Sequence, residues 1–417
     1  MESLRHRCEP LRPRDRHEHH RVSTPLELLF DLTFVIAYGA AAHQLAHALA
    51  AGHHAAGIGG FAFAIFAVSW AWINFSWFAS AYDNDDWLYR LTTMGQMVGV
   101  LILGLGLPAM FRGLEHGVLD NRAMVLGYVI MRVPMVALLA RAAKNDPARR
   151  RGLHLRIASI VVSQVGWCLL LLVRDHLALC VALTAIPLAI EVGTPIVVDR
   201  RHGGLPWHAH HIAERYGLVV IIALGEGLVG TMATLAAVVG PGGPGWSMDV
   251  ALVGLAGTAM TFGMWWIYFV IPSAPLLHAH RDRATGWGHG HMLLFGALIA
   301  VGAGLHVAAY AIDDSSKLSV PATILCTAIP LAIYVGCVFG LYGLITRSSD
   351  PSHRWMLVGS FAVIAAAVGL AFAGVPLVWA LAALALAPWV TVVGYETVGH
   401  RHNTALVEAA AAHHDAA

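Results

Sequence analysis

Long runs of apolar residues, separated by short polar breaks, make up most of this chain. A helix that crosses a bilayer needs about 20 mostly apolar residues, and the alternating pattern of a membrane-spanning strand is absent. The pattern therefore predicts an all-α integral membrane protein. Its spans are expected, in twelve stretches, at 26–51, 58–80, 91–111, 119–141, 155–173, 177–198, 212–239, 247–271, 291–311, 319–345, 355–373 and 376–397.

Turn-forming and charged residues mark the breaks between these spans. Glycine or proline accompanies the breaks at 52–57, 145–152, 241–245 and 373–376. The division between the fifth and sixth spans depends only on Arg174, Asp175 and His176. The polar connection before the ninth span is expected to continue as far as His291.

Basic residues fall mostly on one side of this arrangement. If the N-terminus is cytoplasmic, every cytoplasmic connection carries Lys or Arg, and the other side receives only Arg112, Arg122, Arg174 and Lys317. An excess of Lys and Arg in cytoplasmic loops is the rule for membrane proteins. We therefore expect both ends of the chain in the cytoplasm, with tails at 1–25 and 398–417.

An internal repeat is indicated by three short matches that occur in the same order. DLTFVIAYG at 31–39 aligns with GLVVIIALG at 217–225, and a Trp-Ile-x-Phe motif occurs at 72–75 and at 266–269. A Gly-x-Gly-Leu motif occurs in the third and ninth spans. The interpretation is two parallel six-helix halves, 26–198 and 199–397, as in several secondary transporters; the alternative is chance similarity between apolar sequences.

Composition agrees with this prediction and excludes other classes of protein. Hydrophobic residues make up 58% of the 417, charged residues only 12%, and the mean hydropathy is +0.65. A soluble domain carries about 25% charged residues, so a soluble enzyme and a disordered chain are both excluded. The net charge of +1 gives no reason to expect nucleic acid as a partner. The expected surroundings are a lipid bilayer.

Two acidic residues begin the first span. Thr24 and Glu27 have the spacing of a helix-capping box, with Pro25 between them, so a structural role is favoured for Glu27. Asp31 lies one turn further on and shares a helix face with Glu27. Two acids so placed repel each other unless a cation or proton lies between them, and the candidate cations are Arg21, Arg90 and Arg215.

The seventh span holds the strongest functional candidate. His211, Glu214 and Arg215 lie in its first turns, where the helix dipole favours the acid. Glu226 follows twelve residues after Glu214, about 18 Å along the axis, near the middle of the bilayer. Ionisable groups at that depth are costly and are therefore functional candidates by default.

Arg132 and an acidic connection complete the set of candidates. Arg132 lies in the middle of the fourth span and needs a partner, for which Glu226 and Glu191 are the options. An ion pair, an anion site and a proton-linked switch all remain open for it. The acids of the connection after the second span lack the glycine and distal glutamate of a calcium loop, which favours capping and solvated roles. Its candidate residues are Asp83, Asp86 and Arg90.

Several motifs together resemble a known family. LELLFDLTFVIA at 26–37, DNDDWLYRLTTMGQM at 83–97 and HIAERYGLVVIIALGE at 211–226 are similar to the bacterial low temperature requirement A (LtrA) family, and WWIYF at 265–269 supports the likeness. The resemblance implies a polytopic protein of the bacterial plasma (inner) membrane and brings no established reaction with it. One departure is Gly227, where the family pattern leads us to expect serine. The matching positions are Glu27, Asp31, Asp83, Asp86, Arg90, His211, Glu214, Arg215 and Glu226.

Two functions of different classes compete at this point. The first is a secondary transporter of an unknown small solute, in which Glu226 binds a proton or cation, Asp31 and Glu214 lie on the cytoplasmic path, and Arg132 holds an anionic group or a counter-charge. The second is a membrane-embedded enzyme or lipid-handling protein with an acid, histidine and arginine site at the cytoplasmic face. No hydrolase, nucleotide-binding or metallopeptidase motif occurs, so no cofactor, metal or catalytic residue is assigned. The transporter is the favoured hypothesis.

Overall fold

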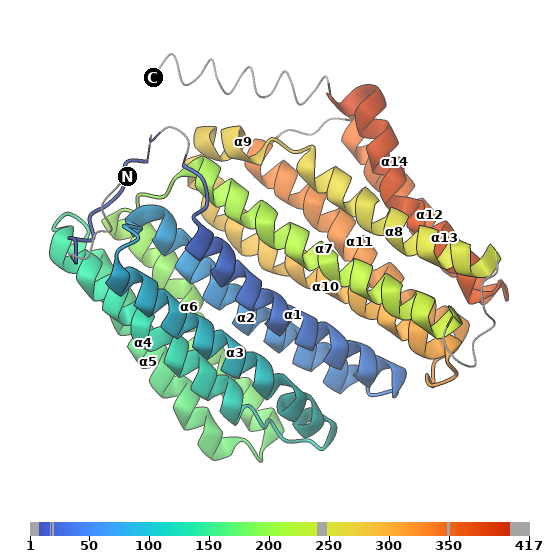
Figure 1. Cartoon of the computed structure of the whole chain (residues 1–417), viewed down its shortest axis with the longest axis horizontal. Helices are drawn as coiled ribbons and strands as arrows, with labels where there is room; N and C mark the ends of the chain where they lie inside the picture. The colour runs from blue at the N-terminus through green and yellow to red at the C-terminus, as the bar shows by residue number, and fades with distance from the viewer. Residues whose placement is uncertain (1–7, 17, 19–20, 240–247, 348–350, 401–417) are drawn as a thin grey trace. The chain divides into compact units, whose positions relative to one another are not determined.

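The computed structural model confirms that the chain is an all-α protein of long apolar helices (Figure 1). It describes every residue except 1–7, 17, 19–20, 240–247, 348–350 and 401–417, so most of the tail expected at 398–417 lies outside the described residues. Within the described part of the chain, twelve helices are long and apolar enough to cross a membrane, and no strand is present. The sidedness of the two ends stays a prediction.

The first six spans follow the prediction closely. The break at Arg174 is confirmed, because α5 and a short 3₁₀ turn end at Val173 and α6 begins at Leu177. Pro134 lies inside α4 without ending it. The helices are α1 (Pro25–Ala50), α2 (His54–Tyr82), α3 (Trp87–Glu115), α4 (Arg122–Asn145), α5 (Arg150–Leu170) and α6 (Leu177–His202).

Two regions of the second half depart from the predicted spans. A short helix follows α8, and α10 begins at Ala284, so His291 lies inside a helix rather than at the end of a polar connection. The twelfth span divides at Leu386, because Pro388 has no N–H to bond the fourth residue before it. The helices are α7 (Ala209–Val239), α8 (Met248–Phe269), α9 (Ser273–Ala279), α10 (Ala284–Ile312), α11 (Val320–Thr346), α12 (Pro351–Phe372), α13 (Leu377–Ala385) and α14 (Ala387–Gly394).

The chain forms two compact units whose boundaries fall inside helices. Unit 1 comprises residues 1–40 and 67–215, and unit 2 comprises residues 41–66 and 216–417. The helices α1, α2 and α7 therefore each contribute one part to each unit. The division of the sequence into two parallel six-helix halves stays a prediction.

Unit 1 contains α3 to α6 packed in chain order, each against the next. Glycines make the closest of these approaches possible. A Cβ atom on Gly99 of α3 would lie 2.6 Å from the carbonyl oxygen of Gly127 on α4, which no side chain tolerates. Small residues that let two backbones meet are a common basis of helix association in membranes, and here they hold the α3–α4 pair together.

Unit 2 has α10 and α11 as a packed pair, with α12, α13 and α14 against α11 and α8. His291 of α10 is buried here because both ring nitrogens have partners. Its Nδ1 lies 2.8 Å from the carbonyl oxygen of Trp287, and its Nε2 lies 3.0 Å from the hydroxyl of Tyr268. A histidine whose ring nitrogens are both bonded fits an apolar interior as a neutral ring. His291 can therefore lie inside α10, which begins at Ala284, within the sequence that was expected to be a polar connection.

Candidate functional site

The capping box predicted at the start of α1 is present. The Thr24 N–H donates to Glu27 Oε2 at 2.8 Å, and the Glu27 N–H donates to Thr24 Oγ1 at 3.3 Å. Glu27 is nevertheless more than a cap, because it also binds two side chains of α7. Arg215 Nη1 lies 3.0 Å and His211 Nε2 lies 3.1 Å from Glu27 Oε1. Glu27 thus fixes the start of α1 to the start of α7.

Arg215 is the cation between the two acids of α1. Its Nε and Nη2 donate to the two oxygens of Asp31 at 3.1 and 2.6 Å, the bidentate geometry that makes an arginine–carboxylate pair strong. The indole Nε1 of Trp72, on α2, donates to the same carboxylate at 2.6 Å. Of the three candidate arginines, Arg215 therefore fills this position. We call Glu27, Asp31, Trp72, His211 and Arg215 the buried charge cluster.

The charged side chains of the buried charge cluster and His211 are almost completely buried. The side chains of Glu27, His211 and Arg215 are 0% exposed and that of Asp31 is 1% exposed. His211 donates through Nε2 to Glu27, and among the described residues its buried Nδ1 has no hydrogen-bond partner. This geometry fits a neutral imidazole. Two carboxylates then face one guanidinium, which leaves an excess negative charge inside the protein.

Arg21 and Asp83 form a second buried pair beside this cluster. Arg21 Nη1 lies 3.6 Å from Asp83 Oδ2, and Arg21 Nη2 donates to the carbonyl oxygen of Ala79 at 3.1 Å. Asp83 also accepts the N–H of Asp85 at 2.9 Å, which shapes the connection between α2 and α3. Burial and the nearby charge of Glu27 together raise the pKa of Asp83 to about 6, against the lowering effect of the arginines.

Because the pKa of Asp83 is raised, we expect the free energy of unfolding to depend on pH. The folded chain holds the Asp83 proton more tightly than the unfolded chain does, so Asp83 lowers the free energy of unfolding as the pH rises from about 4 to about 6. The loss should reach about 3 kcal/mol by neutral pH, and Asp83→Asn should not show it. Detergent-induced unfolding of wild type and Asp83→Asn across this pH range measures the difference.

The control for this titration is Asp175→Asn, because the side chain of Asp175 is 71% exposed. It should follow the wild-type pH dependence throughout. If wild type and Asp83→Asn differ by the same amount at every pH, the assignment of a raised pKa to Asp83 is wrong.

Asp86 and Arg90 have separate roles nearby. Asp86 caps α3 by accepting the N–H of Tyr89 at 2.8 Å, and it forms an ion pair with Arg141. Burial opposes ionisation of Asp86, but the hydrogen bonds from Arg141, Tyr89 and Glu9 outweigh it and lower the pKa. Arg90 pairs with Asp85 at 2.6 Å, and its side chain is 53% exposed. The capping and solvated roles expected for this connection fit the contacts of Asp86 and Arg90, whereas Asp83 is buried and paired with Arg21. Neither Asp86 nor Arg90 belongs to the buried charge cluster.

Glu214 lies next to Arg215 in sequence but faces elsewhere. Its Oε2 accepts the N–H of Ser23 at 3.1 Å, and the residue is exposed. It therefore holds the segment that precedes α1. Arg132, on α4, pairs with Glu191 of α6, one of the two partners considered for it, at 3.8 Å. Arg132 and Glu191 form a second polar group within unit 1.

Glu226 lies in unit 2 and has a different environment. It is 8% exposed, and among the described residues no hydrogen bond or ion pair reaches its carboxyl group. Its backbone packs on α10 so closely that a Cβ atom on Gly302 would lie 2.7 Å from the Glu226 carbonyl oxygen. At the neighbouring Gly227, a Cβ atom would lie 2.7 Å from Thr261 Oγ1 of α8. The glycine at this family position thus lets α8 approach α7.

Trp72 is the member of the cluster that the sequence pattern did not reveal. A signal for it existed, since an indole N–H in an apolar helix needs an acceptor, but nothing in the sequence identifies Asp31 as that acceptor. No group of three or more His, Cys, Asp or Glu side chains that could hold a metal ion occurs among the residues with described positions. The cation that faces the two carboxylates is Arg215.

Comparison with known proteins gives one family and one relative. The chain matches the sequence model described as bacterial low temperature requirement A protein (LtrA) over residues 22–388. It is 27% identical over 250 residues to the uncharacterized protein RA0937 of Rhizobium meliloti (strain 1021), a match that covers 58% of this chain and 57% of that protein. The chain thus spans a little over half the length of that relative. No solved structure matches it.

The family match takes in every residue of the buried charge cluster and Glu226 as well. It extends from the segment before α1 to the first turn of α14. Because the family model matches over this length, and the described part of the chain has twelve long apolar helices, the chain belongs to the bacterial low temperature requirement A (LtrA) family and is a multi-pass membrane protein.

Proposed function

We propose that this protein is a secondary transporter of a small solute in the bacterial plasma membrane, and that Glu226 binds the proton or cation that is moved with the solute. The observation that carries this proposal is the isolation of Glu226. Three other carboxylates are buried in the described spans, and each has an arginine partner: Glu27 and Asp31 share Arg215, and Glu191 has Arg132. Glu226 has none among the described residues.

Isolation of this kind has a chemical consequence. A carboxylate without a partner is costly inside a membrane protein, and binding of a proton or a metal cation removes that cost. Proton relays in pumps and transporters use acids placed in this way. A coupling residue has to take up and release an ion in every transport cycle. Glu226 can do so without breaking a salt bridge.

The helix that carries Glu226 has features that suit such a cycle. Gly225 and Gly227 flank it, and a Cβ atom on Gly225 would meet nothing within 4 Å. Glycines in a membrane helix permit local adjustment of the backbone. At Gly225, α7 therefore has room for a small rearrangement, whereas Gly227 and the backbone of Glu226 pack closely against α8 and α10.

The competing proposal, an enzyme at the cytoplasmic face, requires that a substrate reach the charged groups. Three side chains of the expected site, Asp31, His211 and Arg215, are almost completely buried, and each is bound to another of them or to Glu27. Asp86 and Arg90 point into other interactions. These contacts favour a structural role for the cluster, which supports the transporter over the enzyme.

The test compares wild type with Glu226→Gln in a bacterial strain that lacks its own copy of the gene. Cells are grown cold, and mass spectrometry is run separately on cytosol, medium and lipid extract. At least one soluble compound should show a several-fold difference in its inside-to-outside ratio between the two strains, because glutamine cannot exchange a proton. Membrane content of each variant is measured by immunoblot.

The matched control is Glu396→Gln, since Glu396 is exposed and accepts a hydrogen bond from Trp266 Nε1 at the surface of unit 2. It should leave every ratio at the wild-type value. Equal solute ratios in wild type and Glu226→Gln would refute the transporter. A lipid species that responds to Asp31→Asn and ignores Glu226→Gln would instead support the enzyme.

A further inference from the structure

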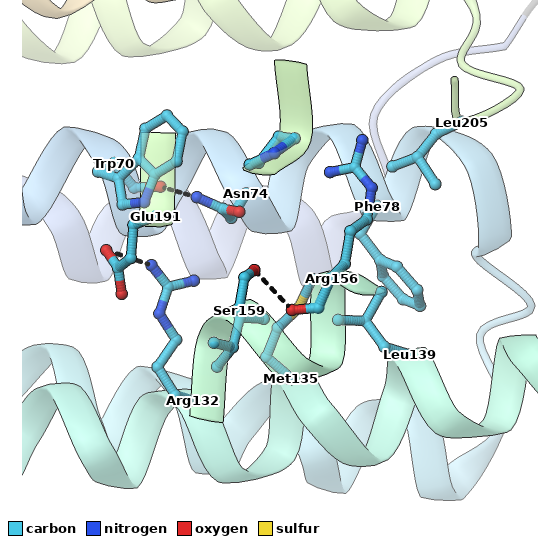
Figure 2. A pocket seen from close by; sticks show the side chains of 12 residues that line it. Trp70, Asn74, Phe78, Arg132, Met135, Leu139, Arg156, Ser159, Glu191 and Leu205 are labelled. Atoms are coloured by element: carbon cyan, nitrogen blue, oxygen red, sulfur yellow. Dashed lines mark hydrogen bonds and ion pairs between the residues drawn. The ribbon is translucent and has the colours of Figure 1, made fainter. Parts of the chain in front are cut away.

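A cavity with polar lining residues lies inside unit 1 (Figure 2), and no residue of the buried charge cluster lines it. It is lined from α2, α4, α5 and α6, with Leu205 of the connection after α6 at one side. Its volume of about 20 Å³ exceeds the space that one water molecule needs. The polar side chains that line it are Asn74, Arg132, Arg156, Ser159 and Glu191.

Arg132 has hydrogen-bond donors to spare at this cavity. Its side chain is 4% exposed, and its Nη2 donates to the hydroxyl of Tyr128 at 2.6 Å. Its buried Nε has no partner among the described residues. A guanidinium group carries five N–H donors, so most of its capacity is unused. An unmet donor on a buried cation is costly, unless a ligand or water satisfies it.

Glu191 does not use up the charge of Arg132. The Tyr128 hydroxyl donates to Glu191 Oε2 at 2.7 Å, and Gln164 Nε2 donates to Oε1 at 3.3 Å. The nearest approach of Arg132 to Glu191 is 3.8 Å, too long for a direct hydrogen bond. The Tyr128 hydroxyl therefore bridges the two charges, and the Tyr128 ring lies 4.6 Å from Arg132 Cζ, against one face of the guanidinium group. The Nε–H of Arg132 remains available to a ligand.

A second arginine contributes to the lining of the cavity. Arg156 pairs with Asp199, which is not among the lining residues, whereas Glu191 is the acid that does line the cavity. Figure 2 shows Arg132 and Arg156 on different helices around the same space, with Ser159 between them. The Ser159 hydroxyl donates to the carbonyl oxygen of Arg156 at 2.9 Å.

We infer that this cavity is a binding site for the carboxylate group of a small anion. The two oxygens of a carboxylate match the planar edge of a guanidinium group, and the small volume excludes a nucleotide or a sugar phosphate. The inference does not depend on Glu226, which lies in the other unit. It is tested by ligand binding to the purified protein, so failure of the proposed transport function would leave it unaffected.

The test uses the purified full-length chain in an uncharged maltoside detergent, with sodium formate as the probe. Saturation-transfer NMR measures contact between the protein and the formate proton. Wild type should give a saturable signal that acetate displaces, whereas phosphate at equal ionic strength, with four oxygens to place, should not displace it. Absence of a saturable signal in wild type would mean that the cavity holds only water and would overturn the inference.

Two variants test the location of the site. Ser159→Val fills the cavity and keeps both arginines, and the double change Arg132→Gln with Glu191→Gln removes the charge pair without leaving one charge buried alone. Each should weaken formate binding at least tenfold while the melting temperature shows a folded protein. Arg122→Gln is the control, because Arg122 is an exposed arginine paired with Asp120, and it should bind formate as wild type does. Equal binding in all variants would overturn the inference.

A carboxylate can belong to a small solute or to a fatty acid. Competition of formate with acetate and with decanoate distinguishes these two sources. Displacement of formate by acetate and decanoate at similar concentrations assigns the site to a small solute. Displacement by decanoate at a more than tenfold lower concentration assigns it to a lipid-derived carboxylate. If neither compound displaces formate, the site does not recognise carboxylates.

Discussion

Arg215→Met is expected to lower the free energy of unfolding by about 3–5 kcal/mol, the cost of removing one partner from a buried ion pair. The side chain of Arg215 is 0% exposed and contacts both Glu27 and Asp31. Methionine fills a similar volume but leaves two carboxylates facing each other without a cation. Because a folded domain has only about 5–15 kcal/mol to lose, the variant should accumulate poorly in membranes.

A rescue experiment distinguishes the electrostatic cause of this loss from a loss of packing. Combining Arg215→Met with Glu27→Gln and Asp31→Asn removes all three charges and should recover most of the lost free energy. Arg90→Gln is the control for loss of an arginine, since the Arg90 side chain is 53% exposed and such pairs contribute little. Detergent-induced unfolding measures all variants. If Arg215→Met alone is as stable as wild type, the cluster does not hold α1 and α7 together.

Gly302→Ala should destabilise the protein by about 1–3 kcal/mol, the usual cost of overpacking. The new methyl group would lie 2.7 Å from the backbone of Glu226 and 2.8 Å from its Cβ atom, so α7 and α10 would have to separate. Alanine favours a helix over glycine by about 1 kcal/mol, so the measured loss is what remains after that gain.

Gly286→Ala is the matched control, because it makes the same change in the same helix. There the new methyl group would meet only Leu344, at an ordinary contact distance of 3.5 Å. It should be neutral or slightly stabilising in thermal unfolding. If the two variants melt at the same temperature, the close approach at Glu226 is not required for packing of α7 on α10.

Much of the fold follows from the sequence because the bilayer imposes a simple length rule. Every span was predicted, including the division at Arg174, where three polar residues are enough to end a helix. The exceptions have local causes that hydropathy does not register. Pro388 divides the last span without any polar residue, and the partners of His291 allow a polar residue to enter α10.

The site was less accessible to such reasoning. The capping box at Thr24 and Glu27 depends on neighbours in sequence, and it was predicted correctly. Which arginine reaches Asp31 depends on how α1 and α7 pack, and the sequence left three candidates. Trp72 was missed for the same reason, because only the packing of α2 on α1 shows that Asp31 is the acceptor of its indole N–H. The isolation of Glu226 likewise becomes visible only once its neighbours are in place.

The central claim is that Glu226 exchanges an ion inside the protein, and infrared difference spectroscopy tests it most directly. Purified protein in liposomes is taken through a pH titration, in sodium-free and in sodium buffers, for wild type, Glu226→Gln and Glu396→Gln. We expect a carboxyl C=O stretching band that responds to pH or to sodium in wild type and in Glu396→Gln, and that is absent in Glu226→Gln. Identical spectra for wild type and Glu226→Gln under every condition would contradict the claim.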